Sequence, residues 1–331
     1  MKVLVTGASG FVGSHAVKAI AGAGHEVRAS ARSADRVRSA LAPLGCADLV
    51  ETVEADVTDE TRVRAALDGC QAVIHAGAVY SFDPRRGREM AGGNVRGAEL
   101  VLGRACELGL DPVVQISSYL ALLPGSPPLT ADSPLSSAPG PYARSKARSE
   151  QVARDLQAQG KPVTIVQPGM VWGPDDPALG ESSRFALSAI KTMLPFAPPG
   201  AVAIVDVRDL AAVLATLLET GRGPRRYLAA GELVPLREVV RIVAENTGRK
   251  GPRGTLPSWL VLLAGRIADG LQRAVPARLP LSYQGPWTAL QGIPFDASPT
   301  TSELGVKFRP AAESIADTTR WLVGQGRLAA A

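Results

Sequence analysis

Two residues four positions apart have the types and spacing needed for proton transfer. Tyr142 and Lys146 lie in a stretch that predicts a helix over 142–159, so their side chains share one helix face. A tyrosine phenol has a pKa of about 10 in water, and a neighbouring ammonium lowers it by favouring the phenolate. We predict that Tyr142 exchanges a proton with a substrate oxygen near neutral pH. A Tyr-x-x-x-Lys spacing also arises by chance on exposed helices, so its context matters.

Further polar residues follow predicted strands. Ser117 and Ser118 end a strand expected over 113–117, at the carboxyl edge where parallel sheets bind ligands. A hydroxyl at this edge would steady the same substrate oxygen, although two serines after a strand often form only a turn. Asn94 lies on a helix expected over 93–108, after a strand over 72–75.

A glycine loop at the start of the chain predicts binding of a dinucleotide. Gly7, Gly10 and Gly13 stand between a buried strand over 2–5 and a helix over 11–22. The first glycine permits the tight turn, the second lets the backbone approach a pyrophosphate, and the third lets helix and sheet pack closely. The helix N-terminus then offers N–H groups and partial positive charge to the phosphates.

The end of the second strand, expected over 25–31, bears on the choice between NAD and NADP. NAD enzymes place a carboxylate here for the ribose 2′-hydroxyl, but this chain has Ala31 followed by Arg32. A guanidinium pairs well with a 2′-phosphate, so we predict NADP in preference to NAD. In the alternative, Arg32 and Arg36 are solvated charges and Asp35 binds the ribose.

Asp56 and Val57 follow the third strand, expected over 49–55. The Asp56 carboxylate is placed to accept from the adenine amino group, with Val57 beside the ring. A helix-capping role for Asp56 fits equally well, although Thr58 or Asp59 are also candidate caps for the helix that ends near 67.

The alternation of short strands and helices predicts a Rossmann-type α/β fold, with a doubly wound parallel sheet and a smaller, mostly helical C-terminal substrate lobe. Residues 202–207 and 210–219 are expected as a strand and a helix returning to the sheet, and 274–300 as loop-rich. Helices are expected over 236–246, 256–271 and 312–322. We place the nucleotide-binding domain at 1–168 and 201–226, and the substrate lobe at 169–200 and 227–331.

Composition excludes several functional classes. The net charge is +5 among 331 residues, and the basic residues form no run with interleaved aromatics, so nucleic acid is not an expected partner. Three widely spaced cysteines and three histidines give neither a disulfide framework nor a metal site. No signal peptide and no apolar stretch long enough to span a bilayer is visible, so a cytoplasmic protein is expected.

Five segments together resemble the extended short-chain dehydrogenases/reductases, also called the NAD-dependent epimerase/dehydratase family. They are Thr6-Gly7-Ala8-Ser9-Gly10-Phe11-Val12-Gly13, Asp56-Val57-Thr58-Asp59, Asn94-Val95-Arg96-Gly97, Ser117-Ser118 and Tyr142-Ala143-Arg144-Ser145-Lys146. The segments 168–174 and 207–211 look similar to later family segments. The chain looks most like the dihydroflavonol-reductase and 3β-hydroxysteroid-dehydrogenase branch.

The resemblance implies roles for individual residues. Tyr142 would be the acid/base, Lys146 would bind the nicotinamide ribose and tune the tyrosine, and Asn94 would support a water relay. Ser118 fits the family's catalytic serine better than Ser117. Two positions depart from the family pattern. His75-Ala76-Gly77-Ala78 replaces the more usual His-x-Ala-Ala, and Gln167 stands where arginine often precedes Pro168. These departures weaken the assignment of a substrate more than the assignment of the reaction.

The predicted cofactor site combines the glycine loop with the family segments. It comprises Gly7, Ser9, Gly10, Phe11, Val12, Gly13, Arg32, Asp56, Val57, Ala76, Gly77, Ala78, Tyr142, Lys146, Pro168, Gly169 and Val171.

Three functions are consistent with this pattern. The leading one is an NADP-dependent oxidoreductase that moves a hydride between nicotinamide and a carbonyl or secondary alcohol. A nucleotide-sugar epimerase or dehydratase with bound NAD is the second, but no asparagine follows Pro168 before Gly200 to contact such a sugar. A non-catalytic NADP-sensing protein is the third, and such relatives usually lack the Tyr-x-x-x-Lys that is intact here. The resemblance also implies a possible homodimer.

Apolar residues of the expected lobe suggest a hydrophobic substrate. One wall would be formed by Phe185, Leu187, Ile190, Met193, Leu194 and Phe196, and the other by Trp259, Leu260, Leu263, Tyr283 and Trp287. The same residues would equally serve as the core of the lobe, or 256–271 as a subunit contact.

Overall fold

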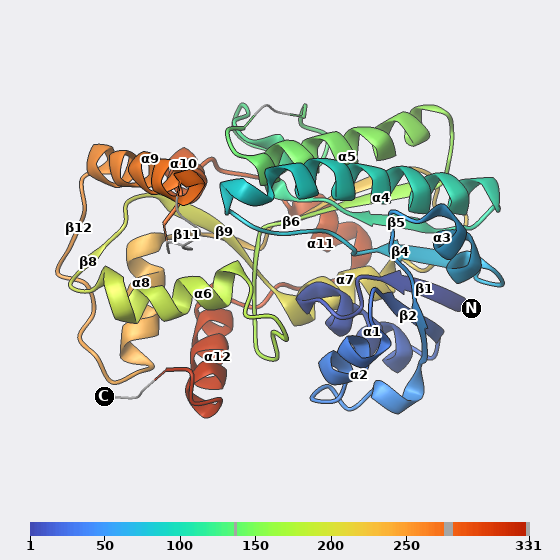
Figure 1. Ribbon diagram of the computed structural model, residues 1–331, viewed down its shortest axis with the longest axis horizontal. Coiled ribbons are helices and arrows are strands. Elements are labelled where there is room, and N and C mark those ends of the chain that lie inside the picture. The colour runs from blue at the N-terminus through green and yellow to red at the C-terminus, as the bar shows by residue number, and fades with distance from the viewer. Residues whose placement is uncertain (136–137, 275–280, 329–331) are drawn as a thin grey trace.

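A seven-stranded parallel sheet forms the centre of the computed structural model, which describes residues 1–135, 138–274 and 281–328 (Figure 1). Its strand order is β10-β6-β5-β4-β1-β2-β3, and every recorded pairing is parallel. The strands are β1 (Lys2–Thr6), β2 (Glu26–Ala31), β3 (Glu51–Glu54), β4 (Ala72–His75), β5 (Val113–Ile116), β6 (Val163–Pro168) and β10 (Arg225–Ala229). The doubly wound Rossmann-type fold is therefore confirmed.

Helices cover both faces of this sheet because alternate strand residues point to opposite sides. Val3 and Val5 of β1 pack into one core with α1 (Phe11–Gly22), α2 (Ala34–Leu41) and α7 (Val207–Thr216). Leu4, between them, packs into a second core with α3 (Glu60–Leu67), α4 (Gly87–Glu107) and α5 (Pro141–Ala158). Near-continuous apolar strands such as 2–5 are the signature of this two-sided burial.

A smaller lobe lies beyond the carboxyl edge of the sheet (Figure 1). It contains the sheet β11-β9-β7 and the pair β12-β8. Its strands are β7 (Met170–Trp172), β8 (Phe196–Ala197), β9 (Ala201–Asp206), β11 (Glu232–Pro235) and β12 (Gly254–Thr255). Its helices are α6 (Glu181–Ser188), α8 (Leu236–Glu245), α9 (Ser258–Ala274), α10 (Gln284–Gln291) and α12 (Ala311–Gly324), while α11 (Ser298–Leu304) adjoins β10.

Short turns connect these elements. They are η1 (Ala47–Leu49), η2 (Pro84–Arg86), η3 (Tyr119–Leu122) and the π turn η4 (Ala189–Met193). Of them, η2 and η3 matter most here, because they follow β4 and β5 at the edge where the predicted site residues gather.

The structure corrects the expected path of the chain after residue 200. The strand expected over 202–207 forms as β9, but it pairs with β7 and β11, and β10 is the strand that completes the central sheet. The short run 227–229 was not recognised as a strand because three apolar residues give little periodicity. Likewise, α10 and α11 occupy the segment expected to be loop-rich, since helices of eight and seven residues carry a weak pattern. The helix expected from 93 begins six residues earlier, at Gly87, with an Arg86–Glu89 ion pair across its first turn.

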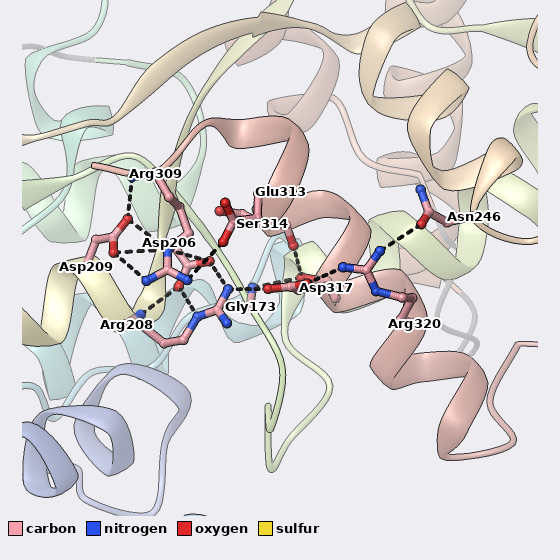
Figure 2. A network of polar contacts seen from close by, with 11 residues as sticks. Gly173, Asp206, Arg208, Asp209, Asn246, Arg309, Glu313, Ser314, Asp317 and Arg320 are labelled. Carbon is pink, nitrogen blue, oxygen red and sulfur yellow. Dashed lines mark hydrogen bonds and ion pairs between the residues drawn. The ribbon is translucent and has the colours of Figure 1, made fainter. Parts of the chain in front are cut away.

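A network of ion pairs joins the C-terminal helix to the rest of the molecule (Figure 2). Arg208 bonds the carboxylates of Asp206 and Asp317, and Arg309 makes a two-pronged contact with Asp209. Asp206 is fully buried, and although burial opposes its charge, hydrogen bonds from Arg208 hold its pKa below the usual range. The family-like segment 207–211 thus anchors α12 through these charges.

Candidate active site

The glycine loop forms a cradle that fits a pyrophosphate. Gly7 has a φ of +68°, and a Cβ on Gly13 would lie 2.2 Å from the Gly7 carbonyl oxygen, so neither position accepts a side chain. Gly10 caps α1 in an extended conformation, with no side-chain cap and no acidic residue in the first turn. The first N–H groups of α1, which carry no intrahelical partner, are therefore left for an anion. Ser9, Phe11 and Val12 lie at this loop and first turn.

The segment after β4 packs directly on this loop. The Thr6 hydroxyl contacts His75 Nδ1 at 2.8 Å and accepts the Gly77 N–H at 3.2 Å. An added Cβ on Gly7 would meet Gly77 Cα at 2.7 Å, so the two backbones touch. Burial lowers the pKa of His75 to about 3, and its imidazole is neutral at physiological pH. Ala76, Gly77 and Ala78 are thereby brought to the predicted cofactor site.

At the predicted adenosine end, Arg32 is exposed just beyond β2, where Ser33 caps α2. Arg32 lies near the carboxylates of Asp56 and Glu89 but forms no ion pair with any described residue, whereas Asp35 pairs with Arg38 at 2.7 Å. The Asp35 side chain is 89% exposed in this pair.

Asp56 shapes the turn after β3 and does not cap α3, since Asp59 is that cap. The Asp56 carboxylate accepts from the Thr58 N–H and hydroxyl, which lower its pKa and keep it charged. Val57 lies between two glycines: its methyl groups are 3.2 Å from a Cβ placed on Gly77 and 3.0 Å from one placed on Gly97. Asp56 and Val57 are therefore close to the 76–78 segment.

Tyr142 and Lys146 lie on the first two turns of α5, with side chains directed toward the end of β5. Their exposed fractions are 7% and 6%. Lys146 Nζ donates to the Ile116 carbonyl at 2.9 Å, and the Ser118 hydroxyl is close enough to the Tyr142 phenol to lower its pKa against the effect of burial. A phenol, a hydroxyl and an amine are thus gathered at one strand end, an arrangement that can hold a carbonyl oxygen and exchange a proton with it.

The pKa values at this site differ from the prediction in one respect. Burial raises the pKa of Tyr142, with the Ser118 hydroxyl opposing it, so the phenol keeps its proton at neutral pH. The Tyr142–Lys146 spacing predicts that the ammonium lowers this pKa, but desolvation of the phenol dominates in the structure. Burial also lowers the pKa of Lys146 to about 8, against a raising effect from Glu150. The site therefore presents a protonated phenol beside an amine that titrates close to neutrality.

Ser117 and Ser118 have different neighbours. Ser117 donates its hydroxyl to Glu150 Oε2 at 2.5 Å, whereas Ser118 faces Tyr142. Ser118, and not Ser117, is thus the serine that lies close to the tyrosine.

Glu150, one turn after Lys146, was missed in the sequence. Its carboxylate is fully buried and accepts from Ser117, from Arg154 at 2.9 and 2.7 Å, and from Gln167 Nε2 at 2.7 Å. The spacing of four from Lys146 was the available signal, because it repeats the face that carries Tyr142 and Lys146. The network ties α5 to the ends of β5 and β6, and gives Gln167 a partner.

Asn94 of α4 holds the loop after β4 against α5. Its amide accepts the Val79 N–H at 2.7 Å and donates to the Val79 carbonyl and to Ser145 Oγ, at 3.1 and 3.0 Å. These bonds engage both ends of the amide and fix the loop that leads to Tyr80.

A cluster of aromatic side chains adjoins Tyr142, and the sequence analysis does not single it out. The ring of Tyr80 lies 4.4 Å from that of Tyr142, and the ring of Phe82 lies 6.3 Å from it. Gln284 of α10 lies against Gly140, the residue that precedes α5, and it is 3% exposed. Within the described part of the chain neither amide atom of Gln284 has a hydrogen-bond partner. A buried, unpaired amide costs free energy, so a polar group of a ligand would stabilise it.

The residues expected to form two walls of a substrate site lie in several different parts of the structure. Phe185, Leu187 and Leu194 pack on the core of the small lobe, which includes Ile190, and Trp287 packs on a cluster around Tyr119. Trp259, Leu260, Leu263 and Phe196 are exposed, Tyr283 is half-buried, and the Met193 side chain lies outside the described residues. Pro168 and Gly169 are buried at the end of β6, and Val171 packs on the core beneath α1.

A basic hollow of about 480 Å³ lies at the N-terminal ends of α4 and α5. Arg85, Arg88, Arg144 and Arg148 line it, together with Pro141 and Ser145, which flank Tyr142 in the sequence. Arg85 is paired with Asp83, while the other three arginines have no ion pair recorded among the described residues.

Comparisons with known proteins agree with this geometry. The sequence model of the "NAD dependent epimerase/dehydratase family" matches residues 3–230. A "Putative dihydroflavonol 4-reductase" of Synechocystis sp. is 27% identical over 97% of this chain and 94% of its own. "Sterol demethylase protein B" of Methylococcus capsulatus is 31% identical over 99% of this chain and 100% of its own. The crystal structure of gox2253 superposes with a TM-score of 0.81, at 27% identity, over 98% of this chain and 99% of that chain.

Within the described residues, no helix is both long enough and apolar enough to cross a bilayer. The family match spans the glycine loop, Tyr142, Lys146 and the strand that completes the sheet. The chain therefore belongs to the NAD-dependent epimerase/dehydratase family, the extended short-chain dehydrogenases/reductases, and is an NAD(P)-dependent enzyme.

Proposed function

We propose that the protein is an NADP(H)-dependent oxidoreductase that interconverts a carbonyl and a secondary alcohol on an apolar small molecule. The observation that carries the proposal is the convergence of Tyr142, Ser118 and Lys146 at the end of β5. NADP(H), when bound, supplies or accepts the hydride. The glycine loop and the N-terminus of α1 would hold its pyrophosphate, and Lys146 its nicotinamide ribose.

The protein's own groups would handle the proton. Ser118 would donate a hydrogen bond to the substrate oxygen and orient it toward Tyr142. Because burial keeps the phenol protonated, Tyr142 would donate its proton to that oxygen during reduction. Glu150 would hold Lys146 and the end of β5 in place through Ser117, and Asn94 would fix the neighbouring loop and support proton relay.

Arg32 supports the choice of NADP. It is exposed and forms no ion pair with a described residue, and it directly follows Ala31, the position where a carboxylate would serve NAD. A guanidinium is well suited to a 2′-phosphate. The aromatic cluster supports an apolar substrate, because Tyr80 and Phe82 border Tyr142. The unpaired amide of Gln284 would be the polar group that fixes the orientation of the substrate. We infer a ketone or alcohol of aromatic, terpenoid or steroid type.

A panel of such carbonyls, assayed by loss of NADPH absorbance, tests this function. Tyr142→Phe should lower turnover at least about a hundredfold while leaving NADPH affinity near normal, because only the transferable proton is lost. Tyr227→Phe, on β10 away from the site, is the matched control and should keep its activity. Full turnover by Tyr142→Phe would exclude the mechanism.

The basic hollow favours a second candidate, a nucleotide-sugar epimerase or dehydratase. Arg88, Arg144 and Arg148 would contact the phosphates of such a substrate, since guanidinium groups bind phosphate in a two-pronged manner. Nucleotide sugars therefore belong in the same panel, with product analysis. In this case, Arg144→Gln/Arg148→Gln would raise KM for the sugar nucleotide. Under the leading proposal, the same variant leaves the uncharged ketone unaffected.

A further inference from the structure

Helix α9 is apolar on two opposite faces. Its inner face carries the buried residues Val261, Gly265 and Ala268, and a Cβ on Gly265 would lie 2.8 Å from the Ser282 carbonyl oxygen. Its outer face carries a stripe of exposed residues: Trp259 (67%), Leu260 (40%), Leu263 (48%), Ile267 (55%) and Leu271 (52%). Four of these recur at intervals of four, so they line one side of the helix.

This stripe holds most of the exposed large apolar side chains of the described chain. The others are Leu49, Tyr80, Leu108 and Phe196. Single exposed apolar residues are ordinary, but a continuous row on one helix marks an interaction surface. In Figure 1, α9 lies at the outer end of the smaller lobe with α10 beside it, which leaves its far side open to a large partner.

The net charge of the chain is concentrated in the stretch of sequence that contains this helix. Residues 246–295 contain six arginines and lysines but only one acid, Asp269, for a net charge of +5. The whole chain also has a net charge of +5, so all its other residues balance to zero. Arg249, Lys250, Arg253 and Arg266 are exposed, and Arg266 is on α9 itself, over the ring of Tyr283.

We propose that α9 docks the enzyme on an anionic bilayer surface, lying in the plane of the interface with its outer stripe among the acyl chains. Amphipathic helices with a Trp/Leu/Ile face and flanking basic residues bind membranes in this way, and the charges attract anionic headgroups. The 17-residue helix carries Arg266 and Asp269 in its middle, which suits an in-plane position rather than a spanning one.

The charge argues against a second copy as the occupant of this surface. A two-fold interface would bring the same basic segment of both chains together, and like charges destabilise such a contact. An anionic lipid surface neutralises these charges instead.

The position of α9 connects the membrane with the candidate active site. α9 packs against η2, and the segment before η2 carries Tyr80 and Phe82 onto the Tyr142 ring. A docked α9 would bring the aromatic cluster around Tyr142 close to the bilayer, where an apolar substrate concentrates. This consequence rests on the proposed function, whereas the docking itself does not.

Vesicle flotation tests the docking. The full chain is mixed with phosphatidylcholine vesicles and with vesicles that contain about one third phosphatidylglycerol, at low and high salt. We expect flotation with the anionic vesicles, weakening as salt rises. Trp259→Ser/Ile267→Ser should weaken binding at least about tenfold, because two large apolar side chains leave the interface. Arg249→Gln/Lys250→Gln should weaken it about fivefold for each charge removed.

Matched variants separate docking from general stickiness. Leu49→Ser/Leu108→Ser removes two exposed apolar residues elsewhere, and Lys18→Gln/Arg64→Gln removes two exposed charges elsewhere. Both should float like the unaltered chain. All variants should keep the thermal stability of the unaltered chain, a control for folding that does not depend on the proposed function. Failure to float with anionic vesicles would overturn the proposal, as would equal loss in the matched variants. A dimer in light scattering that Trp259→Ser/Ile267→Ser abolishes, without vesicle binding, would assign the stripe to a protein contact instead.

Discussion

Glu150→Gln separates the charge of the buried carboxylate from its hydrogen bonds. The amide oxygen can still accept from Arg154 and Gln167, and the Ser117 hydroxyl can rotate to accept from the new amide. What is lost is the negative charge beside the Arg154 guanidinium, whose side chain is only 13% exposed, and near Lys146.

Breaking a buried ion pair by removing one partner costs about 3–5 kcal/mol. Because the substitution keeps the hydrogen-bond geometry, we expect the lower end, about 3 kcal/mol of unfolding free energy. The entropy of unfolding for 331 residues is about 0.7 kcal/mol per kelvin, so the melting temperature should fall by about 4 °C. Glu107→Gln, in an exposed pair with Arg104, is the matched control and should cost about 0–1 kcal/mol.

The same substitution should alter the pH dependence of catalysis. Glu150 raises the pKa of Lys146 against the effect of burial, which leaves that pKa at about 8. Activity that needs the ammonium should therefore decline above about pH 8 in the unaltered enzyme, and at lower pH in Glu150→Gln. Calorimetry measures the change in melting temperature. A profile of kcat/KM between about pH 6 and pH 10 measures the shift of the alkaline limb. A melting temperature like that of Glu107→Gln, or an unmoved alkaline limb, would refute the reasoning.

Two further predictions concern the cofactor and acid stability. Arg32→Ala should weaken NADPH binding by about 1–3 kcal/mol and leave NADH binding unchanged, as measured by titration calorimetry. Arg64→Ala is the control. Tighter binding of NADH than of NADPH by the unaltered protein would contradict the NADP assignment. His75 has a folded pKa of about 3, below its usual value of 6.5, so its contribution to stability is present above pH 6.5 and is lost as the pH falls toward 3. Denaturant unfolding should therefore show an extra loss of unfolding free energy of about 1.4 kcal/mol per pH unit in this window. His75→Gln should remove this loss, and the control His25→Gln should keep it. An unchanged slope of unfolding free energy against pH in His75→Gln would show that another group is responsible.

Local patterns were enough to predict most of the Rossmann part. The apolar strand 2–5, the glycines at intervals of three and the Tyr142/Lys146 spacing are all short-range signals, because strand burial, tight turns and helix faces depend on neighbours within a few residues. The parallel sheet and the family followed from them and are confirmed. The prediction failed for β10, α10 and α11, because these elements are too short to show periodicity.

Only the tertiary structure decided which residues far apart in the chain contact one another. It paired Ser117 with Glu150 and left Ser118 near Tyr142, and these partners lie more than 20 residues away in the sequence. It also set the pKa of Tyr142, because desolvation depends on what packs around the phenol, including Tyr80 from another segment. The sequence by itself determined which groups are available for chemistry and on which faces they lie. Only the folded chain determined which of them meet and how much water remains around them, since burial and long-range contacts are properties of the whole packing.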